Sequence, residues 1–241
     1  MKIEVTSLYD DVIKDSANTA ENGEISVSQF NRLSKRAELS LLNWLTGDVA
    51  GQQPPAPWLT QKNKDWLSPF ITQYKAHAEG GIITRPDDYY QYDNLALIGS
   101  AGNSDCDEDE DDAIPKEVCN TSVELLDGQQ FDIRCNTYID EIKPSLSKPI
   151  AKMIGRTFVF APKDAGSVQL EYIRYPVYAE IKSKKDSVYN DVIPDPLTSK
   201  NYEWDEAVRQ VLIYVITDLW SNITREQASK TFNEATGKQL K

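Results

Sequence analysis

The chain has 241 residues, of which 40% are hydrophobic and 10% aromatic, so it can bury a substantial core and is not a wholly disordered chain. Its formal net charge of −12 repels phosphate. The charge therefore argues against nucleic-acid binding over the whole surface, although it leaves a local basic patch open.

Apolar residues at helical spacing predict two helices within the first 47 residues. The first covers 4–16 and has one apolar stripe. The second begins with a capping box formed by Ser26 and Gln29, and Gly47 ends it. Ile25 and Phe30 have the spacing of a hydrophobic staple around this start. The apolar stripe of the second helix consists of Phe30, Leu33, Ala37, Leu41, Trp44 and Leu45.

The pattern then changes from helices to strands. The proline-rich stretch 52–57 interrupts any helix, and Thr60 is placed to cap a short helix that ends at Leu67. The pair Asp127-Gly128 predicts a hairpin turn between strands over 123–126 and 130–133. The other predicted strands lie at Ile71, 80–83, 89–98, 153–154, 157–160 and 168–175.

An acidic run interrupts this β-rich part. Residues 105–112 contain seven acids, with only Cys106 between them. Asp105 and the next acids alternate as the first ligands of an EF-hand do, but Glu110 replaces the glycine at position six and Lys116 the glutamate at position twelve. The run therefore predicts a solvated loop within 100–116, and weak cation binding is the alternative.

The strongest helical pattern covers about 202–221, with Asn201 as the expected N-cap. This helix has two adjacent apolar stripes, which indicates burial either at the centre of its own domain or in a subunit interface. A more polar helix is expected over 224–237. The order predicts an α+β fold with N-terminal helices, a central, mostly antiparallel β region and a long C-terminal amphipathic helix. We expect a single domain with parts 1–68, 69–200 and 201–241.

The residues needed for catalysis are scarce. His77 is the only histidine, and a turn or surface position suits it best. Nucleotide-binding loops, zinc-protease helices and serine-hydrolase elbows are absent from the sequence. The three cysteines form no metal or disulfide pattern, which suits a reducing site of synthesis. We expect no enzyme, no cofactor and no metal site. The N-terminus lacks a signal peptide and the longest apolar run is too short to span a bilayer, so we expect a soluble protein.

Several short motifs occur in the order found in structural proteins of crAss-like phages and other phages of Bacteroidetes. The chain resembles these proteins over most of its length, although the acidic run has no counterpart in them. The motifs are NTAENG at 18–23, SQFN at 28–31, LTG at 45–47, LSPF at 67–70, RPDDY at 85–89, PS at 144–145, KPI at 148–150, AP at 161–162, EYIRYP at 171–176 and YEWDE at 202–206. The exit of the strand at 171–176 also resembles head–tail adaptor proteins of tailed phages more broadly.

This resemblance implies a head–tail connector, that is, a homo-oligomeric ring in the neck of the virion, twelvefold in the family. Its partners would be the portal protein and adjacent neck or tail ring proteins, with genome DNA only in transit, no membrane, and synthesis in the host cytoplasm. The tail 222–241 would reach a neighbouring protein such as the portal. The candidate subunit or portal interface is Trp204, Val208, Val211, Leu212, Val215, Leu219, Trp220, Arg174 and Tyr175.

Alternatives stay open at this point. Arg174 lies on a strand face beside aromatic residues, so it could pair with a carboxylate of an adjacent subunit or with one of its own chain. Another minor tail or stopper protein would have a similar sequence. A virion-associated hydrolase with a carboxylate site and a host-encoded binding module are the remaining alternatives.

Overall fold

The chain has the α+β fold that its sequence predicts, with N-terminal helices, central antiparallel sheets and a C-terminal helix. The computed structural model describes residues 2–17, 25–47, 61–98, 120–185 and 192–239. The predicted proline-rich break, the Thr60 cap, the acidic run, Cys106 and Cys119 therefore lie outside the described residues.

Two compact units make up the chain. A helical unit comprises Met1–Pro69 and Pro176–Lys241, and a β unit comprises Phe70–Tyr175. The β unit is thus inserted in the sequence of the helical unit. The segment 176–200, which the sequence analysis placed in the β-rich part, belongs with the helices.

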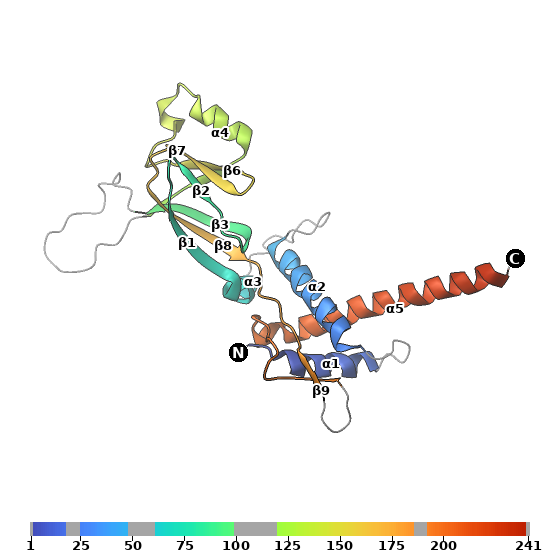
Figure 1. The fold of residues 1–241 in the computed structure, drawn as a ribbon. Coiled ribbons are helices and arrows are strands. Elements are labelled where there is room, and N and C mark those ends of the chain that lie inside the picture. Colours follow the sequence, from blue (N-terminus) through green and yellow to red (C-terminus); the bar gives the residue numbers. More distant parts are fainter. Residues whose placement is uncertain (1, 18–24, 48–60, 99–119, 186–191, 240–241) are drawn as a thin grey trace. The chain divides into compact units, whose positions relative to one another are not determined.

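The helical unit is organised around its last helix. Both α1 (Val5–Ala17) and α2 (Val27–Thr46) pack against α5 (Arg209–Gln239), as Figure 1 shows. The unit also contains α3 (Gln61–Leu67), the short helix η3 (Glu206–Val208) and a pair of short antiparallel strands, β9 (Ser183–Lys185) and β10 (Val192–Pro194).

Local sequence signals fix the ends of α2 as predicted. The Gln29 amide N–H donates to Ser26 Oγ at 3.3 Å, and the Ser26 amide N–H donates to Gln29 Oε1 at 2.9 Å, so the capping box is formed. Gly47 ends the helix in the left-handed conformation, with φ 77°. Ile25 and Phe30 are fully buried beside this cap. The predicted stripe is wrong only at Trp44, which lies near the C-terminal end of the helix and is 52% exposed.

The β unit is a sandwich of two sheets. One has the order β1-β8-β3-β4 and the other β2-β7-β6-β5. Side chains of the two inner faces, among them Leu97, Leu170 and Phe158, form one core. Its elements are β1 (Ile71–His77), β2 (Ile82–Thr84), β3 (Tyr89–Ile98), β4 (Asn120–Ser122), β5 (Glu124–Leu126), β6 (Ile150–Ile154), β7 (Thr157–Ala161) and β8 (Ser167–Arg174), with α4 (Gly128–Cys135) and the 3-10 turns η1 (Ser68–Phe70) and η2 (Asp140–Ile142).

The hairpin predicted at Asp127-Gly128 is wrong. Asp127 is instead the N-cap of α4, because its Oδ1 accepts the Gln130 amide N–H at 2.7 Å. The strand predicted over 130–133 is therefore helical. In place of a hairpin partner, β5 pairs in parallel with β6, and α4 crosses between them and packs on β6.

The C-terminal helix begins later than predicted. Residues 202–204 are not helical, and their backbone pairs with the N-terminal segment: the Tyr202 amide N–H donates to Ile3 O at 3.1 Å and the Ile3 amide N–H donates to Trp204 O at 3.3 Å. Asn201 does not cap this helix; its Oδ1 instead accepts the amide N–H of Val5, the first residue of α1, at 3.1 Å. The cap is Asp205, whose Oδ1 accepts the Ala207 amide N–H at 3.1 Å. The polar helix expected over 224–237 is continuous with α5.

Two adjacent glycines in the turn before β2 offer a matched test of the β unit. A Cβ atom on Gly81, at φ +78°, would lie 2.8 Å from the Lys163 Cα, whereas a Cβ atom on Gly80, at φ +59°, meets nothing within 4 Å. Gly81→Ala should therefore lower the free energy of unfolding by about 2 kcal/mol or more, and Gly80→Ala by about 1 kcal/mol. Urea unfolding of both variants measures the difference, and equal losses would contradict the close approach to Lys163.

Candidate interaction surfaces

The apolar residues predicted for the C-terminal helix mostly face the core of their own unit. Of the nine candidate interface residues, four are at most 5% exposed: Trp204, Val208, Leu212 and Trp220. Ile213 and Ile216 of the second stripe are buried with them. For these positions the structure selects burial within the chain's own domain, one of the two alternatives that the sequence left open.

Three other candidates form a half-buried flank on α5. Val211, Val215 and Leu219 are spaced by four residues, so they lie in one row beside the buried face. Tyr214, next to Val211 and Val215 in this row, is 73% exposed. We call Val211, Tyr214, Val215 and Leu219 the α5 flank. It is an apolar surface that the unit covers only in part.

Arg174 and Tyr175 are at the end of β8 and are held within the β unit. The Arg174 guanidinium lies 5.8 Å from the centre of the Phe70 ring, and its Nη1 donates to Tyr175 O at 3.3 Å. The Tyr175 ring packs edge-on against Tyr90, and its amide N–H donates to Asp88 O at 2.8 Å. Tyr175 remains 42% exposed, so it can still contribute to a contact.

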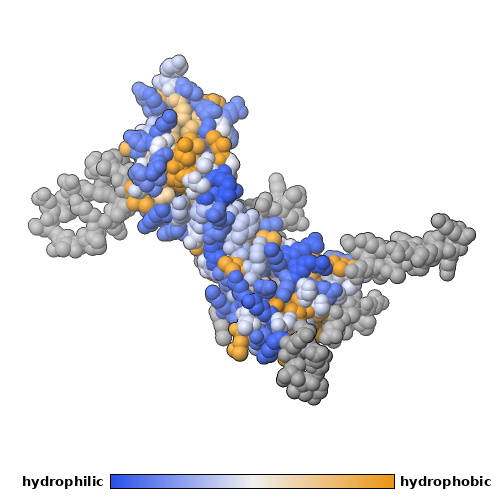
Figure 2. All heavy atoms as spheres, in the orientation of Figure 1, coloured by the Kyte–Doolittle hydropathy of each residue, from blue (hydrophilic) through white to orange (hydrophobic). Residues whose placement is uncertain are grey.

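Hydrophobic side chains also reach the surface of the second sheet. Figure 2 shows hydrophobic residues on the exterior of the β unit. Ile82, Met153 and Ile154 are each between 46% and 56% exposed, and Tyr138, which follows α4, is fully exposed. Isolated apolar residues are common on protein surfaces, but several on one sheet and its covering helix are typical of a contact surface.

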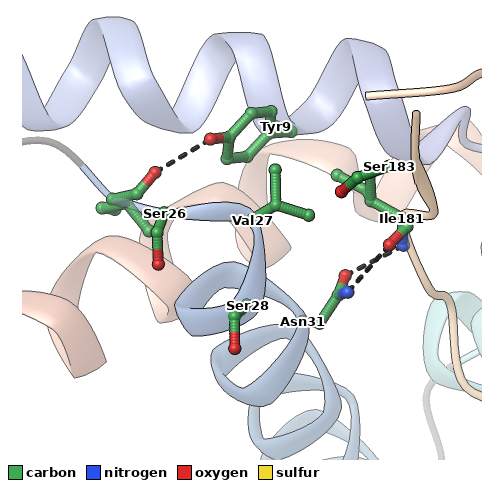
Figure 3. Close-up of a pocket in the computed structure, with 8 residues that line it drawn as sticks. Tyr9, Ser26, Val27, Ser28, Asn31, Ile181 and Ser183 are labelled. Carbon is green, nitrogen blue, oxygen red and sulfur yellow. Dashed lines mark hydrogen bonds between the residues drawn. The ribbon is translucent and has the colours of Figure 1, made fainter. Parts of the chain in front are cut away.

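Residues 177–181, here called the return segment, form backbone hydrogen bonds on two sides. On one side the partners are side chains. Glu203 Oε2 accepts the Val177 amide N–H at 2.8 Å, and Glu38 Oε1 accepts the Ala179 amide N–H at 3.1 Å. Asn31 bonds both the N–H and the C=O of Ile181, each at 2.9 Å (Figure 3). On the other edge, Glu180 pairs with Lys200. The return segment is therefore held on one side by three side chains, two of them from α2, and on the other by a single bridge to Lys200.

Glu38 is the unusual member of this arrangement, because its carboxyl is fully buried. Burial raises its pKa to about 7, against the opposing effect of hydrogen bonds from the Ala179 N–H and the Trp204 side chain, while the charge of Glu203 raises it further. Nearby, the hydroxyls of Ser34 and Tyr202 are 2.5 Å apart, and burial raises the pKa of Tyr202. Sequence reasoning missed this cluster. Its signal was two polar residues, Ser34 and Glu38, on the apolar side of α2.

The described cavities are open and contain no obvious catalytic group. A cavity of about 640 Å³ is lined by residues of α1, the start of α2 and the segment at 181–183 (Figure 3). Two of its polar side chains already have internal partners, because the Tyr9 hydroxyl donates to Ile25 O at 2.8 Å and Asn31 holds the return segment. A cavity of about 420 Å³ in the β unit contains Arg134, which pairs with Glu124. Glu38 lines neither of the two.

Metal-binding clusters and membrane spans are not found in the described part of the chain. Within it, no three His, Cys, Asp or Glu side chains are grouped so that they could hold a metal ion. None of its helices is both long enough and apolar enough to cross a bilayer. His77 is exposed at the end of β1, and Cys135 is partly buried at the end of α4.

The solvent side of α2 has a basic face. Arg32, Lys35 and Arg36 are all exposed within one and a half turns of the helix. The row continues through Ser40 to Trp44 at intervals of four residues, and both of these residues are exposed. We call Arg32, Lys35 and Arg36 the basic face. It is a concentration of positive charge on a chain whose net charge is strongly negative.

No family model matches the chain, and no curated protein matches it at a significant level.

Proposed function

We propose that the chain is a structural virion protein, a subunit of the ring that joins portal to tail in a tailed phage. The motif order in the sequence suggests this role. The feature of the structure that supports it most is the α5 flank, an apolar row that the chain's own helices cover only in part. An apolar row of this kind is suited to packing against a neighbouring subunit.

The length of α5 also suits a subunit that contacts neighbours. The helix has 31 residues, and at 1.5 Å per residue it is about 46 Å long. Figure 1 shows its C-terminal turns extending past α1 and α2. In the proposed ring, different patches of adjacent copies meet and the rotation between copies closes after twelve. The net charge of −12 suits the wall of a channel through which DNA slides without binding.

Native mass tests the function directly. Light scattering after gel filtration, on the chain alone and mixed with the portal protein of the same genome, should show a closed ring or many copies recruited onto the portal. Val211→Asp with Val215→Asp should abolish that assembly but leave the helical content intact, because both side chains are only half buried. Gln210→Asp, exposed on the same helix, is the matched control and should assemble normally. A chain that stays monomeric with and without the portal would refute the ring.

A virion-associated hydrolase is the second candidate, and Glu38 is the observation that bears on it. A carboxyl whose pKa is about 7 is suited to general acid or base chemistry at neutral pH. However, Glu38 is 0% exposed, so a substrate could reach it only if the core opened. We therefore favour the structural role, in which Glu38 holds the return segment.

A further inference from the structure

The basic face of α2 has no acidic partner among the described residues. None of the ion pairs that the structure shows there includes Arg32, Lys35 or Arg36. The Lys35 ammonium lies over the Tyr178 ring, 4.6 Å from its centre. The one acid within α2, Glu38, is fully buried and is used to hold the return segment. Three cations are thus available to a ligand on one helix surface.

The composition of this surface is that of a protein contact. Arginine presents several donors in a planar fork that fits carboxylates in pairs, and arginine and tryptophan are both enriched at energetically important contact positions. Trp44, at the end of the row that contains Arg32 and Arg36, keeps 52% of its surface exposed. A basic face with an exposed indole at its end is expected to bind an acidic peptide segment better than a bare anion.

The chain itself contains the complementary segment. Residues 105–112 contain seven carboxylates, the densest charge in the sequence. We propose that the basic face of α2 binds the acidic run 105–112 of a second copy of this chain. This inference rests on the proposed ring, and it names the contact between neighbouring subunits that helps to close it.

Symmetry favours a second copy over nucleic acid as the ligand. The contact between copies joins two different patches. Each subunit presents one basic face and one acidic run, so every copy binds a neighbour on both sides, as a ring requires.

Two complementary variants and their mixture test the contact. The first, Arg32→Glu with Arg36→Glu, reverses the basic face; the second replaces the seven acids of 105–112 by their amides. Each variant alone should fail to assemble. An equimolar mixture should form a species of twice the monomer mass, because the acidic run of the first variant can still bind the intact basic face of the second. Lys143→Glu with Lys163→Glu, the same reversal at exposed positions of the β unit, is the control and should assemble like the wild type. Raising the salt from about 0.05 M to 0.5 M should weaken the wild-type association at least tenfold.

Each other outcome overturns the inference in a recognisable way. Variants that assemble as well as the wild type would contradict this contact but not the proposed ring. Two monomeric variants whose mixture stays monomeric would show that the two charged segments do not join separate copies. A third outcome would assign the basic face to nucleic acid. In it, the wild-type protein binds duplex DNA at physiological salt, the first variant does not bind DNA, and the native mass of the two proteins is the same. Wild-type protein that is monomeric throughout would refute the contact, and recruitment onto the portal then decides separately whether the proposed function survives.

Discussion

Leu212→Asp should unfold the helical unit. The side chain is 0% exposed on the face of α5 that packs in the core, so the substitution would create a cavity and bury an unpaired carboxylate together. We expect the free energy of unfolding to fall by more than about 4 kcal/mol, a large fraction of the stability of an ordinary domain. Urea unfolding followed by the helical circular dichroism signal measures this loss.

The control for this substitution is on the same helix. Tyr214, two residues further along α5, is 73% exposed, so Tyr214→Asp should change the free energy of unfolding by no more than about 0.5 kcal/mol. Both substitutions place aspartate in the same helix, and the difference in helix propensity between the replaced leucine and tyrosine, at most about 0.7 kcal/mol, is small beside the expected loss. If the two variants unfolded at the same urea concentration, the buried face of α5 would have been assigned to the wrong side.

Local signals in the sequence were sufficient where neighbouring residues determine the structure. Ser26, Gln29 and Gly47 predicted both ends of α2 because caps are made by atoms within four residues of one another. The same kind of signal failed at Asp127-Gly128, because an aspartate in that position can either begin a hairpin turn or cap a helix. The parallel pairing of β5 with β6 decides between them, and this pairing joins residues more than twenty positions apart.

The candidate site was predictable only in part, for a related reason. A helix that is apolar on a broad face has the same pattern whether it packs in its own domain or against another subunit, so the sequence could not separate Leu212 from Val211. The structure separates them, since Leu212 is fully buried and Val211 is half buried. The hydrogen bond between Ala179 and Glu38 joins residues 141 positions apart. The only local sign of it in the sequence was an acidic residue on the apolar face of α2.

Glu38 should make the stability of the helical unit depend on pH. Its pKa rises from 4.5 to about 7 on folding, so the folded chain binds this proton more tightly than the unfolded chain does. The stabilisation that the proton provides is therefore fully present below pH 4.5, declines as the pH rises through the interval, and is lost above about pH 7. The shift corresponds to about 3 kcal/mol.

Glu38→Gln should remove this dependence, because the amide stays neutral at every pH while its carbonyl can still accept the Ala179 N–H. Subtracting its unfolding free energy from that of the wild type at each pH isolates Glu38 from the other groups nearby, Glu203, Lys200 and Tyr202. The unfolding free energy of the wild type minus that of the variant should fall by about 3 kcal/mol between pH 4.5 and 8. Glu180→Gln removes a carboxylate from the exposed side of the return segment and controls for the loss of charge alone. A difference that stays constant over this range would mean that Glu38 is hydrated in solution, and the return segment would then be held less tightly than its hydrogen bonds indicate.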